Sequence, residues 1–445
     1  MQTTVGLSVQ SEKVGERVGR LREQALGSTP RLCAERAALM TDAWFSSPAL
    51  PPVRRRAEAL AAILRQMTVF IADDELLVGN QASEIRAAPV FPEYAVDWLA
   101  EEIDGLSQRK ADPFQVSPEA RSELLRIVAR WRGHTHEDRV LATLPREVLS
   151  GWQDVKAFSL IPLTCCGPGH LTVDYPTVLR EGLRGVMARA ERHLSGLDLA
   201  RPEDLAKVPF LEAVLVAGQA VVDFAGRYAS LARSLAEAEP HPRRRGELLA
   251  IAEVCERVPA LPARTFHEAV QSLWLVQLVL QIESSGHSVS LGRVDQYLYP
   301  YYREDVQAGR LTEAQATELL ACLWVKLFWI NKARPWGNTQ YAAGYPTYQN
   351  ATIGGQTPDG EDATNDLTYL CLAAMDATRL PTPNLSARYH HRSPDRYLRA
   401  CAEVIGKGFG MPALENDEAI VPALLARGVS LEDAHDYAMV GCVEV

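Results

Sequence analysis

The C-terminal residues Gly441-Cys442-Val443-Glu444-Val445 place a thiol two positions before a carboxylate. The glycine before Cys442 permits a tight turn and a close approach of the backbone to a ligand. On an extended segment, side chains at positions i and i+2 point to the same face, so Cys442 and Glu444 can address adjacent atoms of one small substrate. The spacing is compatible with thiol chemistry assisted by a carboxylate. Taken alone, however, this pentapeptide is better explained as a frayed tail that holds an incidental cysteine.

Three other segments combine glycines with side chains that can bind polar groups. His170 follows two glycines in Gly167-Pro168-Gly169, and glycines around a histidine can present it in a cleft. His287 and Ser288 follow Gly286, and together they offer adjacent hydrogen-bond donors and acceptors. Tyr345 follows Gly344 and fits either a pocket wall or the core. A surface loop is the alternative for each histidine.

Other motifs with possible chemistry carry less weight. His134, His136 and Asp138 imitate a metal site, but no further ligand set lies near them, and a solvated loop explains them better. No G-x-G-x-x-G run follows a strand pattern, and there is no G-K-[ST] phosphate loop. We therefore expect no metal ion and no bound organic cofactor.

Composition excludes several classes of partner. The 445 residues carry a net charge of -10 with 47% apolar and 23% charged residues, an ordinary globular balance. An acidic chain lacks the basic patches that nucleic acid or an anionic membrane surface requires. The eight cysteines form no C-x-x-C pair, which favours reduced thiols. The polar N-terminus does not resemble a signal peptide, and no apolar run reaches the ~18 residues of a membrane helix. We expect a cytoplasmic protein.

The elements that position these residues alternate between helices and short strands. Apolar spacing and capping patterns predict helices over residues 54–67, from Pro176, from Pro202, over 312–328 and from Ser430. Short strand-like segments are expected at residues 75–80, 289–292, 351–355 and 439–442. Alternation of this kind favours an α/β layer or barrel with functional loops at one end of the strands. Neither a repeat nor a domain linker is evident.

Taken together and in this order, these segments resemble the glycyl radical enzymes of the pyruvate formate-lyase superfamily. The resemblance runs from Arg17 almost to the last residue. Its motifs are Cys33–Ala37, Asp74–Asn80, Pro89–Tyr94, Gly292–Tyr297 and Gly441–Glu444. It implies that residues 1–445 form the N-terminal part of a ten-stranded β/α barrel, helix-rich and incomplete, with Cys442 on a central finger loop.

Within this superfamily the chain is most similar to the dehydratase and C–X lyase branch, in which one cysteine precedes a glutamate by two residues. Pyruvate formate-lyase itself uses two adjacent cysteines, which Gly441 excludes, and arylalkylsuccinate synthases lack the glutamate found at Glu444. The pattern is similar to glycerol and propanediol dehydratases. That similarity implies substrate-binding roles for four residues: His170, His287, Ser288 and Tyr345.

The resemblance also implies a mechanism. A thiyl radical on Cys442 removes hydrogen from a small diol, Glu444 acts as base, and His170 or His287 serves as general acid for the departing hydroxyl. The radical would be stored on a glycine in a C-terminal segment, installed by a radical S-adenosylmethionine activating enzyme. A homodimer is expected for the complete enzyme, which would work anaerobically.

Two departures from the family pattern leave alternatives to this hypothesis open. Val445 stands where the family continues with proline, and no R-V-x-G-Y type motif occurs in the chain. We therefore expect the C-terminal glycine radical domain to be absent, the chain alone to be inactive, and an isolated half-barrel to self-associate. Another C–X lyase acting on choline, hydroxyproline or a sulfonate is one alternative. A non-catalytic remnant or binding subunit is a second, and a thiol hydrolase, which needs a histidine bonded to Cys442, is a third.

Overall fold

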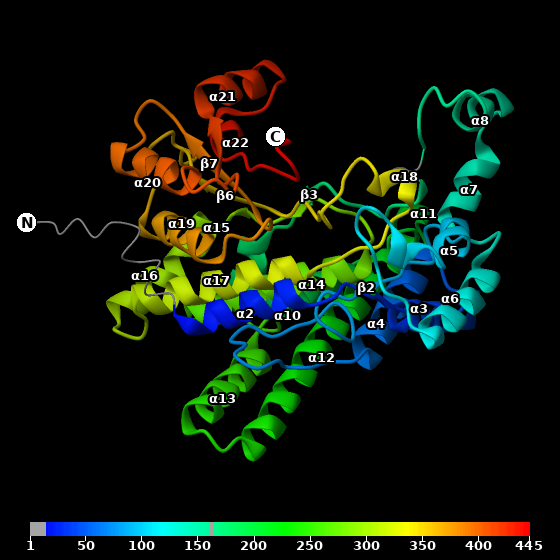
Figure 1. The fold of residues 1–445 in the computed structure, drawn as a ribbon, viewed down its shortest axis with the longest axis horizontal. Helices are drawn as coiled ribbons and strands as arrows, with labels where there is room; N and C mark the ends of the chain where they lie inside the picture. Colours follow the sequence, from blue (N-terminus) through cyan, green and yellow to red (C-terminus); the bar gives the residue numbers. More distant parts are fainter. Residues whose placement is uncertain (1–14, 161–163) are drawn as a thin grey trace, which may run out of the picture.

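The computed structural model describes residues 15–160 and 164–445. Helices dominate the N-terminal part, and two short strands, β1 (Leu32–Cys33) and β2 (Ala88–Pro89), pair in parallel between them. Figure 1 shows this part as the blue and cyan segments beneath and to one side of the later elements. Its helices are α2 (Glu16–Gly27), α3 (Glu35–Ser46), α4 (Pro52–Gln66), α5 (Asp97–Glu102), α6 (Pro118–Trp131), α7 (His136–Thr143) and α8 (Arg146–Gln153).

The middle of the chain adds long helices and a second pair of strands. Strands β3 (Leu171–Thr172) and β4 (Val289–Ser290) pair in parallel, although more than a hundred residues separate them in the sequence. The helices between and after them are α10 (Tyr175–Ser195), α11 (Pro202–Leu205), α12 (Val208–Ala238), α13 (Pro242–Arg257), α14 (Phe266–Glu283), α15 (Val294–Tyr297), α16 (Tyr299–Gln307), α17 (Glu313–Trp329) and α18 (Trp336–Thr339).

Two helices, α14 and α17, form the centre of the core. Most residues of both are buried, 14 of 18 in α14 and 13 of 17 in α17, as expected for helices that are apolar on most sides. The Thr312 side chain accepts from the Gln315 backbone and the Gln315 side chain accepts in return, which confirms the predicted capping box at the start of α17. The strands lie over these two helices (Figure 1), so the core supports the loops at the strand ends.

The C-terminal third is built on a parallel sheet in the order β5-β6-β7-β8. Helices α19 and α20 connect successive strands, as right-handed parallel crossovers require. The predicted α/β architecture is confirmed, with strands at two of the expected places near residues 290 and 352. The bounds are β5 (Gly292–Arg293), β6 (Asn350–Gly354), α19 (Asp366–Thr378), β7 (Asn384–Tyr389), α20 (Asp395–Ile405), β8 (Ala413–Asn416), α21 (Asp417–Ala426) and α22 (Leu431–His435).

The strand predicted at residues 75–80 is wrong. This segment is irregular, and a side chain takes the place of a neighbouring strand: Gln271 of α14 accepts from the Val78 amide (2.9 Å) and donates to the Val78 carbonyl (2.9 Å). The apolar pattern reflected burial against α14. A pattern of apolar residues does not reveal which group satisfies the backbone.

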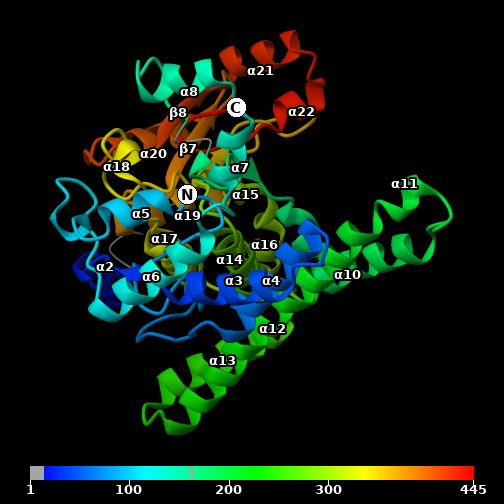
Figure 2. The same ribbon diagram turned by 90° about the vertical axis from the view of Figure 1, so that its right-hand side faces the viewer.

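Helices α10 to α13 project from one side of the molecule, as Figure 2 shows. Within the described residues, the stretch Pro202–Ala238 is long and apolar enough to cross a membrane by length and composition, and 17% of its most apolar window is buried. Two of its carboxylates pair with arginines of α4: Glu212 with Arg54 (3.1 Å) and Asp223 with Arg65 (3.0 Å). These ion pairs add to the packing of buried α12 residues such as Phe224 and Tyr228.

Candidate active site

The loops that carry His170 and His287 are bound to each other through their backbones. Strands β3 and β4 pair with Leu171 opposite Val289, so the residues before them lie side by side. The His170 amide donates to the His287 carbonyl (3.0 Å), and the Leu171 amide donates to the Ser288 carbonyl (3.2 Å). The two imidazole rings are 5.7 Å apart between centroids. The structure thus brings together both predicted histidines, which lie 117 positions apart in sequence.

Glycines permit this close approach. A Cβ on Gly169 would lie 2.9 Å from the His287 amide nitrogen, and a Cβ on Gly286 would lie 2.6 Å from the Gly167 carbonyl oxygen, with still closer contacts beside each. No side chain fits at either position without movement of the backbone. The glycines noted around His170 therefore serve the packing of one loop on the other.

Cys442 sits on a tight turn. Val440 and Glu444 exchange two backbone hydrogen bonds, of 2.7 and 3.0 Å, and Gly441 between them has a φ of 64°. The tight turn predicted at Gly441 is confirmed. The extended segment predicted for Cys442 to Glu444 is wrong, because the backbone reverses direction within these residues. Side chains anchor the turn, since Ser290 Oγ accepts from the Gly441 amide (2.9 Å) and Asn350 donates to its carbonyl (3.3 Å).

The turn places Glu444 beside His170 and Ser288. His170 Nε2 lies 4.0 Å from Glu444 Oε1, with both side chains about half exposed. A Cβ on Gly441 would lie 2.6 Å from Ser288 Oγ and 2.8 Å from Glu444 Oε2, so both oxygens flank this glycine. Ser288 Oγ and His287 Nδ1 are buried without a hydrogen-bond partner. Glu444, His170 and Ser288 thus lie close to the turn that carries Cys442, and the unpartnered polar atoms of Ser288 and His287 are available to a ligand.

The environment sets the protonation of two of these groups. Burial, with the charges of Arg334, Lys332 and His170, lowers the pKa of His287 to about 3, so its imidazole is neutral near pH 7. Burial and the Glu444 charge raise the pKa of Cys442 above its ordinary value. Cys442 therefore carries its hydrogen as a thiol. No hydrogen bond among the described residues joins a histidine to its sulfur, so the arrangement does not support the hydrolase alternative.

Tyr345 contacts Pro113 and Phe114, and a neighbouring tyrosine, Tyr348, lies beside His287. The Tyr345 hydroxyl donates to the Pro113 carbonyl (2.7 Å), and its ring packs edge-on against Phe114 at 5.4 Å. The ring of Tyr348 lies 5.8 Å from that of His287, and burial raises the pKa of Tyr348 above its ordinary value. Sequence reasoning missed Tyr348, because both tyrosines follow Gly344 and only the backbone path separates them.

Backbone strain is concentrated at this site. His170, Ser288 and Tyr348 have φ angles of 53°, 66° and 50°, in the left-handed region that residues with a Cβ rarely adopt. Each such residue costs on the order of 1–2 kcal/mol. Strained residues persist where the surrounding structure determines them, and they gather at ligand-binding and catalytic positions.

Three basic side chains that sequence reasoning missed bind the loop of His287. Arg36, Arg56 and Lys332 all donate to main-chain carbonyls of residues 282–286. The Lys332 amino group is buried, and burial lowers its pKa well below the ordinary value. Lys332 follows α17 in the run Asn331-Lys332-Ala333-Arg334. A polar run directly after an apolar helix is the sequence signal that could have identified Lys332. The bonds are Arg36 Nε to Ile282 (2.6 Å), Arg56 Nη2 to Glu283 (3.0 Å) and Lys332 Nζ to Ser284 (2.9 Å) and Gly286.

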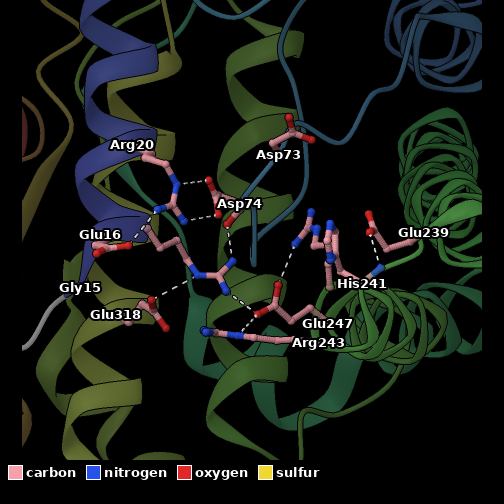
Figure 3. Close-up of a pocket in the computed structure, with 12 residues that line it drawn as sticks. Gly15, Glu16, Arg20, Asp73, Asp74, Glu239, His241, Arg243, Glu247 and Glu318 are labelled. Atoms are coloured by element: carbon pink, nitrogen blue, oxygen red, sulfur yellow. Dashed lines mark hydrogen bonds and ion pairs between the residues drawn. The ribbon is translucent and has the colours of Figure 1, made fainter.

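A separate pocket of about 550 Å³ lies between α2, α13, α17 and the segment near Asp74, and Figure 3 shows its charged lining. Arg20 pairs with Asp74 (2.6 Å), and Arg17 pairs with Glu318 (3.2 Å) and with Glu247. The carboxylate of Glu247 also forms an ion pair with Arg243 (3.2 Å). Because the arginines of Figure 3 pair within the protein, the pocket is a structural charge network that joins helices.

Among residues 15–160 and 164–445, no group of three or more histidine, cysteine, aspartate or glutamate side chains could hold a metal ion. His136 opens α7 and Asp138 closes its capping box with Thr135, so this part of the imitation metal site is a helix start. The prediction of a solvated loop at these residues is wrong, because His136 and Asp138 belong to α7.

Known proteins resemble this chain over most of its length. The family model described as pyruvate formate lyase-like matches residues 10–445. The chain belongs to this family. Among its curated relatives, the probable dehydratase YbiW of Escherichia coli (strain K12) is 43% identical over 93% of this chain and 52% of its own length. An isethionate sulfite-lyase of Desulfovibrio desulfuricans is 41% identical over 97% of this chain and 53% of its own.

Solved structures of glycyl radical dehydratases share the fold. A structure of the protein for 1,2-propanediol dehydration in Roseburia inulinivorans has a TM-score of 0.94 and 40% identity, covering 96% of this chain and 54% of that one. Hydroxyproline dehydratase from Clostridioides difficile has a TM-score of 0.92 at 31% identity. The family resemblance and the glycyl radical enzyme fold are confirmed. The chain spans about half the length of the curated relatives it matches.

Proposed function

We propose that this chain supplies the thiol half of a glycyl radical lyase that removes water from a small hydroxylated substrate. The observation that carries the proposal is the position of Glu444, which shares one tight turn with Cys442 and lies 4.0 Å from His170. Relatives named as dehydratases and lyases support the reaction class.

Cys442 would exchange one hydrogen atom with the substrate. Its thiyl form takes hydrogen from the carbon that bears a hydroxyl group, so the S–H bond forms as the C–H bond breaks. Glu444 accepts the proton of that hydroxyl. The adjacent C–O bond then breaks, and His170 donates the proton with which the second hydroxyl leaves as water. Cys442 returns its hydrogen atom to the product radical, which gives an aldehyde or ketone.

Electrostatics distinguish the two histidines. With a pKa lowered to about 3, His287 is neutral at physiological pH and suits a hydrogen-bonding role toward the substrate. His170 is half exposed and faces Glu444, so we assign the general acid to His170. The proton gained by Glu444 can pass across this pair to restore His170, which balances the cycle. Ser288 orients the leaving hydroxyl.

The radical itself would come from a glycine outside residues 1–445, and it would convert the Cys442 thiol to a thiyl radical. A radical S-adenosylmethionine enzyme would install it, and the assembled enzyme would be a homodimer. The second candidate reaction is C–S cleavage of a hydroxyalkyl sulfonate, because relatives named isethionate sulfite-lyase are about as similar to this chain as the named dehydratase.

Anaerobic production from the native locus together with an activating enzyme tests the proposal. A glycyl-type doublet in the electron paramagnetic resonance spectrum and turnover of a diol or sulfonate panel are expected. The variant Cys442→Ser should keep the doublet, the fold and substrate binding, but lose turnover by at least about 10³-fold. Turnover by Cys442→Ser near the wild-type rate, or a silent spectrum in the wild type, would overturn the proposal.

A further inference from the structure

The hydroxyl group of Ser290 joins three segments of the candidate active site. Ser290 ends β4 and is fully buried. Its Oγ accepts from the Gly441 amide of the cysteine turn (2.9 Å) and from the Asn350 amide at the start of β6 (3.2 Å), and it lies 3.4 Å from the Ser288 carbonyl oxygen. One oxygen atom thus contacts the cysteine turn, the sheet and the loop that carries His287.

These three contacts fix the direction of the hydroxyl proton of Ser290. A serine hydroxyl donates one hydrogen bond and accepts two. Backbone N–H groups occupy both acceptor positions, so the O–H group is left to donate to the Ser288 carbonyl. Because every hydrogen-bonding position of Ser290 Oγ is used in a buried place, its rotation would leave a buried polar group unpaired.

Asn350 binds the other polar group of Gly441. Its side-chain nitrogen donates to the Gly441 carbonyl (3.3 Å) and to Ser386 Oγ of β7 (3.0 Å). The Gly441 carbonyl belongs to the planar peptide unit that continues into the nitrogen of Cys442, so this bond fixes the orientation of the unit from which Cys442 begins. Buried side chains of β4 and β6 therefore hold the turn from both sides of Gly441.

The turn packs so closely on the other site residues that its position determines their separation from Cys442. A Cβ on Gly441 would lie 2.6 Å from Ser288 Oγ and 2.8 Å from Glu444 Oε2. Cys442 itself is exposed, so its placement depends on the backbone on either side of it. Transfer of a hydrogen atom requires close and aligned reacting atoms, and a misplacement of about 1 Å can slow such a step about 100-fold.

We propose that Ser290 and Asn350 are positioning residues that hold the Cys442 sulfur at the distance needed for hydrogen transfer. Both act through the backbone of Gly441, and neither needs to touch the substrate. Because Ser290 also donates to the Ser288 carbonyl, it ties the cysteine turn to the loop that binds the substrate. The inference deepens the proposed lyase function and rests on it for the transfer of hydrogen to Cys442.

The kinetic test uses the assembled enzyme, produced anaerobically from the native locus with its activating enzyme. Turnover of 1,2-propanediol and of 2-hydroxyethanesulfonate is measured for the wild type, Ser290→Ala and Asn350→Ala. Each variant should lower kcat about 10- to 100-fold, with KM within about threefold of the wild type. The glycyl doublet should keep its intensity, because the radical is stored outside this turn. The two variants release the turn from different sides, so each tests the inference if the other fails to fold.

Isotopic substitution identifies the step that is slowed. With each probe deuterated at the carbon that bears the reacting hydroxyl, the isotope effect on kcat should stay as large as in the wild type or increase, because hydrogen transfer has become slower. Ser272→Ala is the matched control. Ser272 of α14 is equally buried, and its hydroxyl has no hydrogen-bond partner among the described residues. This variant should leave kcat and KM unchanged.

A wild-type kcat in Ser290→Ala and Asn350→Ala would overturn the inference, and so would a smaller isotope effect or a loss confined to KM. Failure of the proposed function gives a different result. Turnover that survives in Cys442→Ser rejects the thiyl mechanism, and the positioning role with it. Turnover that depends on Cys442 but not on Ser290 or Asn350 rejects the positioning role alone.

Discussion

Substitution of Gly286 by alanine tests whether close contact between the two histidine loops holds the candidate site together. A Cβ at this position would lie 2.6 Å from the Gly167 carbonyl oxygen, where ordinary contact begins at 3.4 Å, and it would approach the Pro168 carbonyl more closely still. The obstacles are backbone atoms, so the loops must separate by at least about 0.8 Å, and overpacking of this kind costs about 1–3 kcal/mol.

Four hydrogen bonds join these loops and are weakened by such a movement. Each contributes about 1 kcal/mol, so we expect Gly286→Ala to lower the free energy of unfolding by about 2–4 kcal/mol. The bonds are His170 N to His287 O (3.0 Å), Leu171 N to Ser288 O (3.2 Å), Ser284 Oγ to Pro168 O (2.7 Å) and Gly167 N to Ser285 Oγ (2.9 Å).

Urea denaturation measures the overall change, and amide hydrogen exchange at His170 and Leu171 reports on the loop contact itself. Gly226→Ala is the matched control, because its Cβ on α12 would meet nothing within 4 Å. That variant should be neutral or stabilising by up to about 1 kcal/mol, since alanine favours a helix. The reasoning is refuted if Gly286→Ala unfolds within about 0.5 kcal/mol of the wild type and both amides stay protected.

Two further predictions concern buried charge and pH. Arg388→Met should destabilise the fold by about 3–5 kcal/mol, because it leaves the buried Asp417 carboxylate without its counter-charge. In urea denaturation, the double variant with Asp417→Leu should recover most of this loss. A loss below about 1 kcal/mol for Arg388→Met contradicts this reasoning. The pKa of His287, lowered from 6.5 to about 3, means that only the unfolded chain binds a proton between these values. Stability from this residue should be present above pH 6.5 and decline as pH falls toward 3; equal pH dependence in wild type and His287→Gln contradicts this.

Local features of the fold followed from sequence with good accuracy. The start of α17 at Thr312 and the start of α22 at Ser430 depend on side chains three residues away, so a short window contains the necessary information. Residues 75–80 were misassigned, because the group that satisfies Val78 is Gln271, which lies 193 positions away. Apolar spacing registers burial but not the partner of the backbone.

Some residues of the candidate site could be recognised from the sequence, and others only from the structure. Cys442, His170, His287 and Ser288 stand out by residue type beside glycines, and Glu444 follows Cys442 by two positions. The structure brings Glu444 next to His170 and Ser288. Tyr348 does not stand out, because it resembles Tyr345. Its interest arises from a neighbour that comes from another segment.

The sequence by itself determined the helix caps, the glycine turn before Cys442 and the order of motifs that places the chain in its family, since each is a property of residues near one another. Only the tertiary structure decided that His287 is neutral near pH 7 and that the ring of Tyr348 lies beside it. These properties depend on desolvation and on charges brought together from distant segments. Such effects depend on distances in space, which the order of residues along the chain does not specify.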